Sequence, residues 1–218
     1  MIRSIGGRLV LALIALVGVL AWTQRDQLPA MRNWAVDVFQ RTDRIGPAAE
    51  PSEKLALRAE RKLHSLLADR DGATARFSGT EVQSYVAFRL APQLPPGVTD
   101  PQVAIKDSTF AVRVRVQLED IQDMNVDMLR QMLGDSTSIE AEFEPGIASP
   151  GIAEVEVLSL RAGAFPIPPL AIPLVLREAG LNTRGGMSRA VTFPVEPAVT
   201  AIAVRGGNLE VTTAPRGE

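Results

Sequence analysis

The side chains that most often carry out acid–base or nucleophilic chemistry are few in this sequence, and they are not grouped as a catalytic site requires. The one histidine, His64, lies in an amphipathic stretch beside Leu63. A zinc site needs three or four ligands, so one histidine with scattered carboxylates does not predict a metal centre. No serine stands in the G-x-S-x-G context of a hydrolase nucleophile. The chain has no cysteine, which excludes disulfides, thiolate metal sites and a cysteine nucleophile.

Closely spaced carboxylates are the strongest remaining signal for chemistry. They are Glu140, Glu142, Glu144, Glu154 and Glu156. Paired carboxylates can serve as general acid and base. Here they alternate with apolar residues, as on the solvated face of a half-buried strand. Arginines at alternate positions of a neighbouring strand would pair with them. The sequence therefore predicts no catalytic residue, no metal site and a protein that is not an enzyme.

Composition narrows the class of partner. The chain has 218 residues, of which 46% are hydrophobic, 22% charged and only 5% aromatic, and its formal net charge is −2. These values are ordinary for a globular protein, and the core must be largely aliphatic. A nucleic-acid-binding protein usually carries a basic patch with interleaved aromatics, so we expect no nucleic-acid partner. No nucleotide-binding glycine motif appears in its required context, and we expect no cofactor.

The N-terminus predicts a link to a membrane. Arg3 and Arg8 precede an uncharged apolar run from Leu9 to Trp22. As a helix this run would be roughly 21 Å long, shorter than a hydrocarbon core of about 30 Å, unless Arg8 snorkels to the surface. Residues 1–22 are thus a membrane anchor or a cleaved signal peptide. The positive flank keeps the N-terminus inside and places the rest outside the cytoplasm. A retained anchor gives a single-pass protein of the inner (cytoplasmic) membrane, with its C-terminal domain in the periplasm or outside the cell.

Residues 23–52 form an amphipathic segment and a linker. Apolar residues from Met31 to Phe39 recur at helical spacing, so this helix could rest in the membrane interface or pack against a protein. Residues 46–52 have the composition of a linker. We expect residues 53–214 to fold as one extracytoplasmic domain.

Helical and strand periods both occur within residues 53–214. Ser52 can cap a helix that runs to about Arg70, and Ser78 with Glu81 matches a capping box that opens a second helix. Strict alternation over residues 110–118 predicts a half-buried antiparallel strand with a hairpin before it. Further alternation predicts strands over residues 138–144 and 152–160 and a hairpin at Gly206 and Gly207. A change of face after Val157 predicts a bulge or a strand bent from one surface to another.

The stretch "RAGAFPIPPLAIPLVLREAGL", residues 161–181, is the least ordinary part of the chain. Four prolines stand among large aliphatic residues, so its first half can be neither a helix nor a central strand. A short helix from Ile172 to Gly180 is expected to follow. A second apolar stretch is rich in methionine, a residue suited to surfaces that accept varied apolar partners. Both stretches could instead simply complete the core. The candidate ligand-binding residues are Phe165, Ile167, Leu170, Ile172, Leu176, Met128 and Met132.

The order of the helical and strand periodicities predicts an α+β domain with a twisted antiparallel sheet. The residues of two motifs also resemble those of a known family. The region "FSGTEVQSYVAFRLAPQLPPGVTDPQVAIKDSTFAVRVRVQLEDI" and the later "GIAEVEVLSLRAGAFPIPPLAIPLVL" resemble small membrane-anchored bacterial envelope proteins of the TULIP-like lipid-binding group. The resemblance covers residues 78–181. It implies a strongly bent antiparallel sheet, a half-barrel packed against a helix, whose concave side holds acyl chains. The proline segment would then lie at the mouth of the half-barrel.

Two functions are consistent with these patterns. The first is a membrane-tethered envelope protein that binds or transfers a lipid or other amphiphile in an apolar groove. The alternative is a non-catalytic scaffold or docking component of an envelope assembly, with another envelope protein as partner. A cavity large enough for an acyl chain would favour the first, and a filled core with an exposed apolar patch would favour the second.

Overall fold

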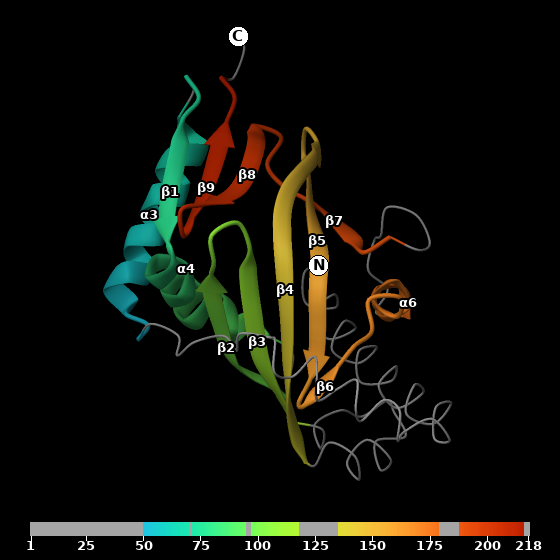
Figure 1. Cartoon of the computed structure of the whole chain (residues 1–218). Coiled ribbons are helices and arrows are strands. Elements are labelled where there is room, and N and C mark those ends of the chain that lie inside the picture. The colour runs from blue at the N-terminus through green and yellow to red at the C-terminus, as the bar shows by residue number, and fades with distance from the viewer. Residues whose placement is uncertain (1–49, 70, 95–96, 118–134, 179–187, 216–218) are drawn as a thin grey trace, which may run out of the picture.

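The computed structural model describes residues 50–69, 71–94, 97–117, 135–178 and 188–215, which form antiparallel strands in two sheets with a few helices. This confirms the α+β class (Figure 1). The predicted anchor over residues 1–22, the amphipathic helix that follows it, Met128 and Met132 lie outside the described residues. Within the described ranges, none of the helices has the length and apolar character needed to cross a membrane.

Helix α3, Glu53–Ala68, is the longest described helix. Its buried face consists of Ala56, Ala59 and Leu66, which recur at helical spacing. Ser52 occupies the N-cap position as expected, but its side chain makes no capping hydrogen bond. Its backbone N–H instead donates to Ser84 Oγ at 3.1 Å, which ties the start of α3 to the next helix.

Helix α4, Gly79–Tyr85, begins with the predicted capping box. The Ser78 hydroxyl accepts from the Glu81 backbone N–H, and the Glu81 carboxylate accepts from the Ser78 N–H at 3.0 Å. The helix continues as a π-helical turn, η3, Val86–Leu90, and a 3-10 turn, η4, Ala91–Gln93. The predicted second helix is therefore present, with irregular winding where Pro92 approaches.

The larger sheet has six strands, and the order β2-β3-β4-β5-β6 is completed by β7, which also pairs with β5. Its strands are β2 (Val98–Ile105), β3 (Phe110–Gln117), β4 (Ser136–Ser149), β5 (Ile152–Ala162), β6 (Phe165–Pro166) and β7 (Ala190–Pro194). The hairpin predicted before β3 is present: β2 and β3 are joined by a turn at residues 106–108, which the Lys106 N–H bond to the Thr109 carbonyl closes. Strand β7 was not predicted from the sequence.

One face of this sheet is apolar across every strand. The β3–β4 register pairs Val112 with Ala141 and Val114 with Ile139, while Arg113 pairs with Glu140 on the opposite face. The predicted bulge in β5 is confirmed: Glu142 pairs with Ser159 and Phe143 with Val157, so Leu158 is the extra residue. The bulge keeps Val157 and Leu160 on the apolar face although they are three residues apart.

The smaller sheet has the order β1-β9-β8, with β1 (Thr74–Ser78), β9 (Asn208–Thr213) and β8 (Val199–Arg205). The β8–β9 hairpin turns at Gly206 and Gly207 as predicted, and both have positive φ, as a tight hairpin turn requires. Figure 1 shows β8 beside one end of the long strand β4, and contacts between β8 and β4 join the two sheets.

The described residues form two apolar clusters. One lies between the larger sheet and helix α6, Ile172–Glu178, and includes Val116, Val157 and Val175, all at most 1% exposed. The other lies between α3 and the smaller sheet and includes Leu66, Phe77 and Val211. The predicted short helix after the proline segment is thus α6, and it packs on the sheet. The described strands do not close into a barrel.

Candidate functional site

An apolar cavity of about 210 Å³ lies on the apolar face of the larger sheet, where the smaller sheet and α4 face it. Strands from both sheets contribute to it, together with α4 and η3. The lining residues are Val82, Val86, Val103, Ile105, Phe110, Val112, Pro145, Gly146, Ala153, Glu154, Val155, Phe193, Ile202 and Leu209. The cavity therefore lies where segments far apart in the sequence meet.

The lining side chains are large and apolar but are not fully packed. Of the large ones only Val103 is buried, whereas Ile105, Phe110, Val112 and others are half-buried. In a close-packed interior such side chains would be covered on all sides. Phe193 is 40% exposed, so the cavity reaches the surface at β7. The arrangement leaves apolar surface facing an open space.

The local sequence explains why these side chains face the same space. Alternation with a period of two brings Ile105, Phe110 and Val112 to one face of the β2–β3 hairpin. Helix α4 presents Val82 to that face. The position of α4 is set by the buried Gln83, whose side chain accepts a hydrogen bond from the Val103 N–H and donates to the Pro101 carbonyl at 3.2 Å. Gln83 thus anchors α4 to β2 at the bulge between Thr99 and Gln102.

The chemical character of the cavity is that of a binding site for apolar groups. Among the described residues that line it, only Glu154 is titratable. Its walls offer aliphatic and aromatic surface to a ligand and no nucleophile–base pair. The described part of the chain also holds no group of three or more residues able to bind a metal ion.

The predicted ligand-binding residues fall into three groups. Phe165 and Leu170 are 47% and 84% exposed and do not line the cavity. Met128 and Met132 lie outside the described residues. Ile167, Ile172 and Leu176 are buried in the cluster beneath α6, with exposures of 7%, 0% and 3%.

Ile167, Ile172 and Leu176 thus lie in a packed cluster and not on the wall of the cavity. Helix α6 turns Ile172 and Leu176 onto the sheet, and Ile167, which precedes α6, belongs to the same cluster as Val116 and Val157. Within the described part of the proline segment, Phe165 and Leu170 are the exposed large hydrophobic residues.

Sequence periodicity predicted the elements that carry several lining residues, but not a site. Phe110 and Val112 belong to the predicted alternating strand, and Ile202 and Leu209 belong to the predicted hairpin at Gly206 and Gly207. Phe193 was missed together with β7, although the run "AVTFP" has the β-branched and aromatic residues typical of a strand. No local signal distinguishes an inward residue that packs from one that borders a cavity.

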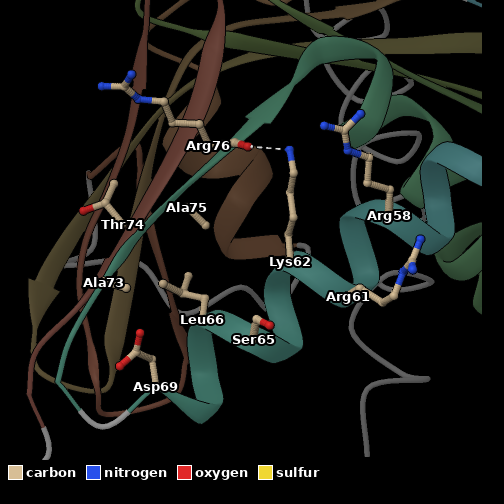
Figure 2. Close-up of a pocket in the computed structure, with 10 residues that line it drawn as sticks. All are labelled: Arg58, Arg61, Lys62, Ser65, Leu66, Asp69, Ala73, Thr74, Ala75 and Arg76. Atoms are coloured by element: carbon tan, nitrogen blue, oxygen red, sulfur yellow. Dashed lines mark hydrogen bonds between the residues drawn. The ribbon is translucent and has the colours of Figure 1, made fainter.

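A second hollow, of about 490 Å³, lies between α3 and the edge strand β1 (Figure 2). Arg58, Arg61 and Lys62 approach it from α3, and the Lys62 Nζ donates to the Arg76 carbonyl at 3.0 Å. Figure 2 shows the Arg76 side chain extending away from α3; its guanidinium pairs with Glu210 at 2.7 Å. We call this hollow the α3–β1 groove.

The buried carboxylate of Glu81 lies beside this groove. It is 4% exposed and forms ion pairs with Lys62 at 2.7 Å and Arg58 at 3.2 Å. Burial alone would raise the pKa of the Glu81 carboxyl. The hydrogen bonds from Lys62 and from the Ser78 backbone, and the charges of Lys62 and Arg58, outweigh burial and lower that pKa.

Comparisons of this chain with models of protein families, with curated proteins and with solved structures found no match.

Proposed function

We propose that this domain binds the apolar part of a lipid or other amphiphile in the cavity between its two sheets. The observation that carries the proposal is the set of half-buried aliphatic and aromatic side chains around an open space. Apolar surface that faces water costs about 25 cal/mol per Å², so a ligand that covers it gains that free energy. The larger antiparallel sheet would act as the half-barrel that the TULIP-like resemblance implies.

The size of the cavity suggests which part of the ligand it holds. At about 210 Å³ it exceeds the apolar cavity of about 150 Å³ that admits benzene in another protein. It is smaller than the roughly 300–1,000 Å³ typical of pockets that enclose a drug-sized molecule. It therefore fits a segment of one acyl chain or a compact apolar ring, with the remainder of the amphiphile outside.

Residues 1–22 would tether this domain to the outer surface of the cytoplasmic membrane, close to the lipids of the bilayer. A tethered domain with an apolar cavity open at β7 could take up a single chain from the bilayer and pass it on. A phosphatase reporter fused after Glu218 should be active if the domain lies outside the cytoplasm. Activity of a cytoplasmic reporter at that position would contradict the tethering.

The test of ligand binding uses the full chain in lipid nanodiscs with a photoactivatable fatty acid, followed by mass spectrometry of the cross-linked peptides. Cross-links should fall on peptides that line the cavity, and Ile105→Asn should reduce their yield because it places a polar group on the wall. Leu170→Asn is the matched control, since Leu170 is 84% exposed and lies outside the cavity. Equal yields in the two variants would exclude the cavity as the binding site.

Docking to another envelope protein is a second candidate function, favoured by one observation. Leu170 and Phe165 expose large apolar side chains close together in the sequence on the proline segment. If this segment is the functional surface, Leu170→Asn should abolish association with the partner and leave fatty-acid cross-linking unchanged.

A further inference from the structure

Strand β1 has a free edge in the described structure. It pairs with β9 on one side, and the order β1-β9-β8 leaves its other side without a strand. Antiparallel pairing directs the backbone groups of alternate residues to opposite sides. The Thr213 N–H donates to the Ala73 carbonyl, so the groups of Ala73 and Ala75 face β9 and those of Thr74 and Arg76 face outward.

The outward groups of β1 face the α3–β1 groove. The Arg76 carbonyl accepts from the Lys62 Nζ, which places this carbonyl on the side of α3. Among the described residues, no hydrogen bond to the N–H of Thr74 or to that of Arg76 is present outside the ladder with β9. A carbonyl has two lone pairs, so the Arg76 carbonyl can keep Lys62 and accept a second donor. An extended chain is the ligand that satisfies such alternating donors and acceptors together.

Charge indicates the kind of chain that fits. Arg58, Arg61 and Lys62 lie on one side of α3, at spacings of three and four residues. Glu81 neutralises one charge of the pair formed by Arg58 and Lys62. Arg61 Nε donates to the Leu57 carbonyl at 3.3 Å, and no carboxylate among the described residues pairs with it. Asp69 lies at the C-terminal end of the groove. Arg76 also lines the groove and is paired with Glu210, so four cations exceed the three carboxylates of Glu81, Asp69 and Glu210 by one charge beside the free edge.

We propose that the α3–β1 groove binds an extended acidic peptide segment of a partner protein, which adds as a strand to the free edge of β1. The backbone of the segment pairs with Thr74 and Arg76, and its carboxylates face Arg58 and Arg61. β1 has only five residues, so the added strand is short and the complex is of modest affinity. This site is separate from the cavity, because the two share no lining residue.

A planar anionic membrane is the other partner that a basic helix face could meet. The edge of β1 favours the peptide, since lipid phosphates do not supply the alternating donors and acceptors of a strand. The two partners are separated by the experiment below.

The test measures binding of a fluorescent peptide of alternating glutamate and valine to the full chain in phosphatidylcholine nanodiscs. The acidic peptide should bind, and a peptide with lysine in place of glutamate should not. Arg61→Glu should weaken binding about tenfold or more because it reverses a charge next to the peptide. Arg115→Glu is the matched control, as Arg115 is an exposed arginine on the other sheet.

The contribution of the strand edge is measured with a second pair of variants. Thr74→Pro removes an N–H that faces away from β9, and proline is tolerated at the first residue of an edge strand. It should weaken peptide binding about tenfold, the equivalent of one good hydrogen bond. Thr74→Val keeps the N–H and should bind as the unaltered chain does. Thermal unfolding establishes that each variant is folded.

Three outcomes would overturn the proposal. The first is failure of the acidic peptide to bind. The second is equal binding by Thr74→Pro and Thr74→Val, which would mean that the edge takes no part. The third is an effect of Arg61→Glu no larger than that of Arg115→Glu. If the peptide fails while phosphatidylglycerol in the discs protects Arg58 and Arg61 from phenylglyoxal, the groove contacts anionic lipid instead.

Discussion

Two valines on the same face of β3 should respond differently to truncation to alanine, because one packs in the core and the other borders the cavity. Val116 is fully buried in the cluster beneath α6. Val112 is half-buried and lines the cavity. The backbone environment is shared, since both residues lie in one strand and pair with β4.

The expected magnitudes follow from what each side chain loses. Val116→Ala removes two methylene-equivalents, worth about 0.8 kcal/mol each in transfer, and leaves a void. The free energy of unfolding should therefore fall by about 2–3 kcal/mol. For Val112→Ala the space beside the side chain already exists, so little new void forms. Because only part of the side chain is covered, the loss should be about 1 kcal/mol or less.

The assay is thermal unfolding followed by circular dichroism. A change of 1 kcal/mol shifts the midpoint by roughly 2–4 °C in a domain of this size. The midpoint should thus fall by about 5–10 °C for Val116→Ala and by no more than about 4 °C for Val112→Ala. Equal losses would mean that Val112 is packed like Val116, and the cavity would then not be an open space in solution.

Three further predictions concern Gln83, Glu81 and Gly72. Gln83→Leu leaves the Val103 N–H buried without its acceptor, so the free energy of unfolding should fall by about 1–3 kcal/mol, measured by urea unfolding. Because the pKa of the Glu81 carboxyl is lowered in the folded chain, the unfolded chain binds a proton at this carboxyl more readily than the folded chain does. The stability that Glu81 contributes is present above about pH 4.5 and is lost as the pH falls below it. Glu81→Gln should accordingly flatten the acid limb of the stability–pH curve, and an unchanged limb would refute the ion pairs. Gly72→Ala should cost more than Gly207→Ala: both glycines have φ near +75°, but only at Gly72 would a Cβ meet other atoms, at 2.8 Å.

Periodicity was enough to predict most of the architecture. The alternation over residues 110–118 gave β3 and its apolar face, and the phase change after Val157 gave the bulge. The capping box at Ser78 and Glu81 fixed the start of α4. These features depend on residues close together in the sequence, so local rules apply to them.

The location of the candidate site could not be predicted in the same way. The proline segment looked like a ligand mouth because it is too apolar for a solvated loop, yet Ile172 and Leu176 are buried beneath α6. The cavity instead joins α4 and β2 with β9, which lies about a hundred residues further along the chain. Whether an inward side chain is covered depends on the shapes of the elements opposite it, and this information is not contained in any one segment.

The most direct test of the central claim is to locate a bound acyl chain by isoleucine-methyl NMR. The full chain in nanodiscs would be titrated with dodecanoate. Ile105 and Ile202 line the cavity, whereas Ile139 and Ile172 belong to the packed core beneath α6. We predict that the methyl signals of Ile105 and Ile202 shift together with a saturable profile, while those of Ile139 and Ile172 stay in place. Saturable shifts at Ile172 without shifts at Ile105, or no saturable shift at any of the four, would contradict binding in the cavity.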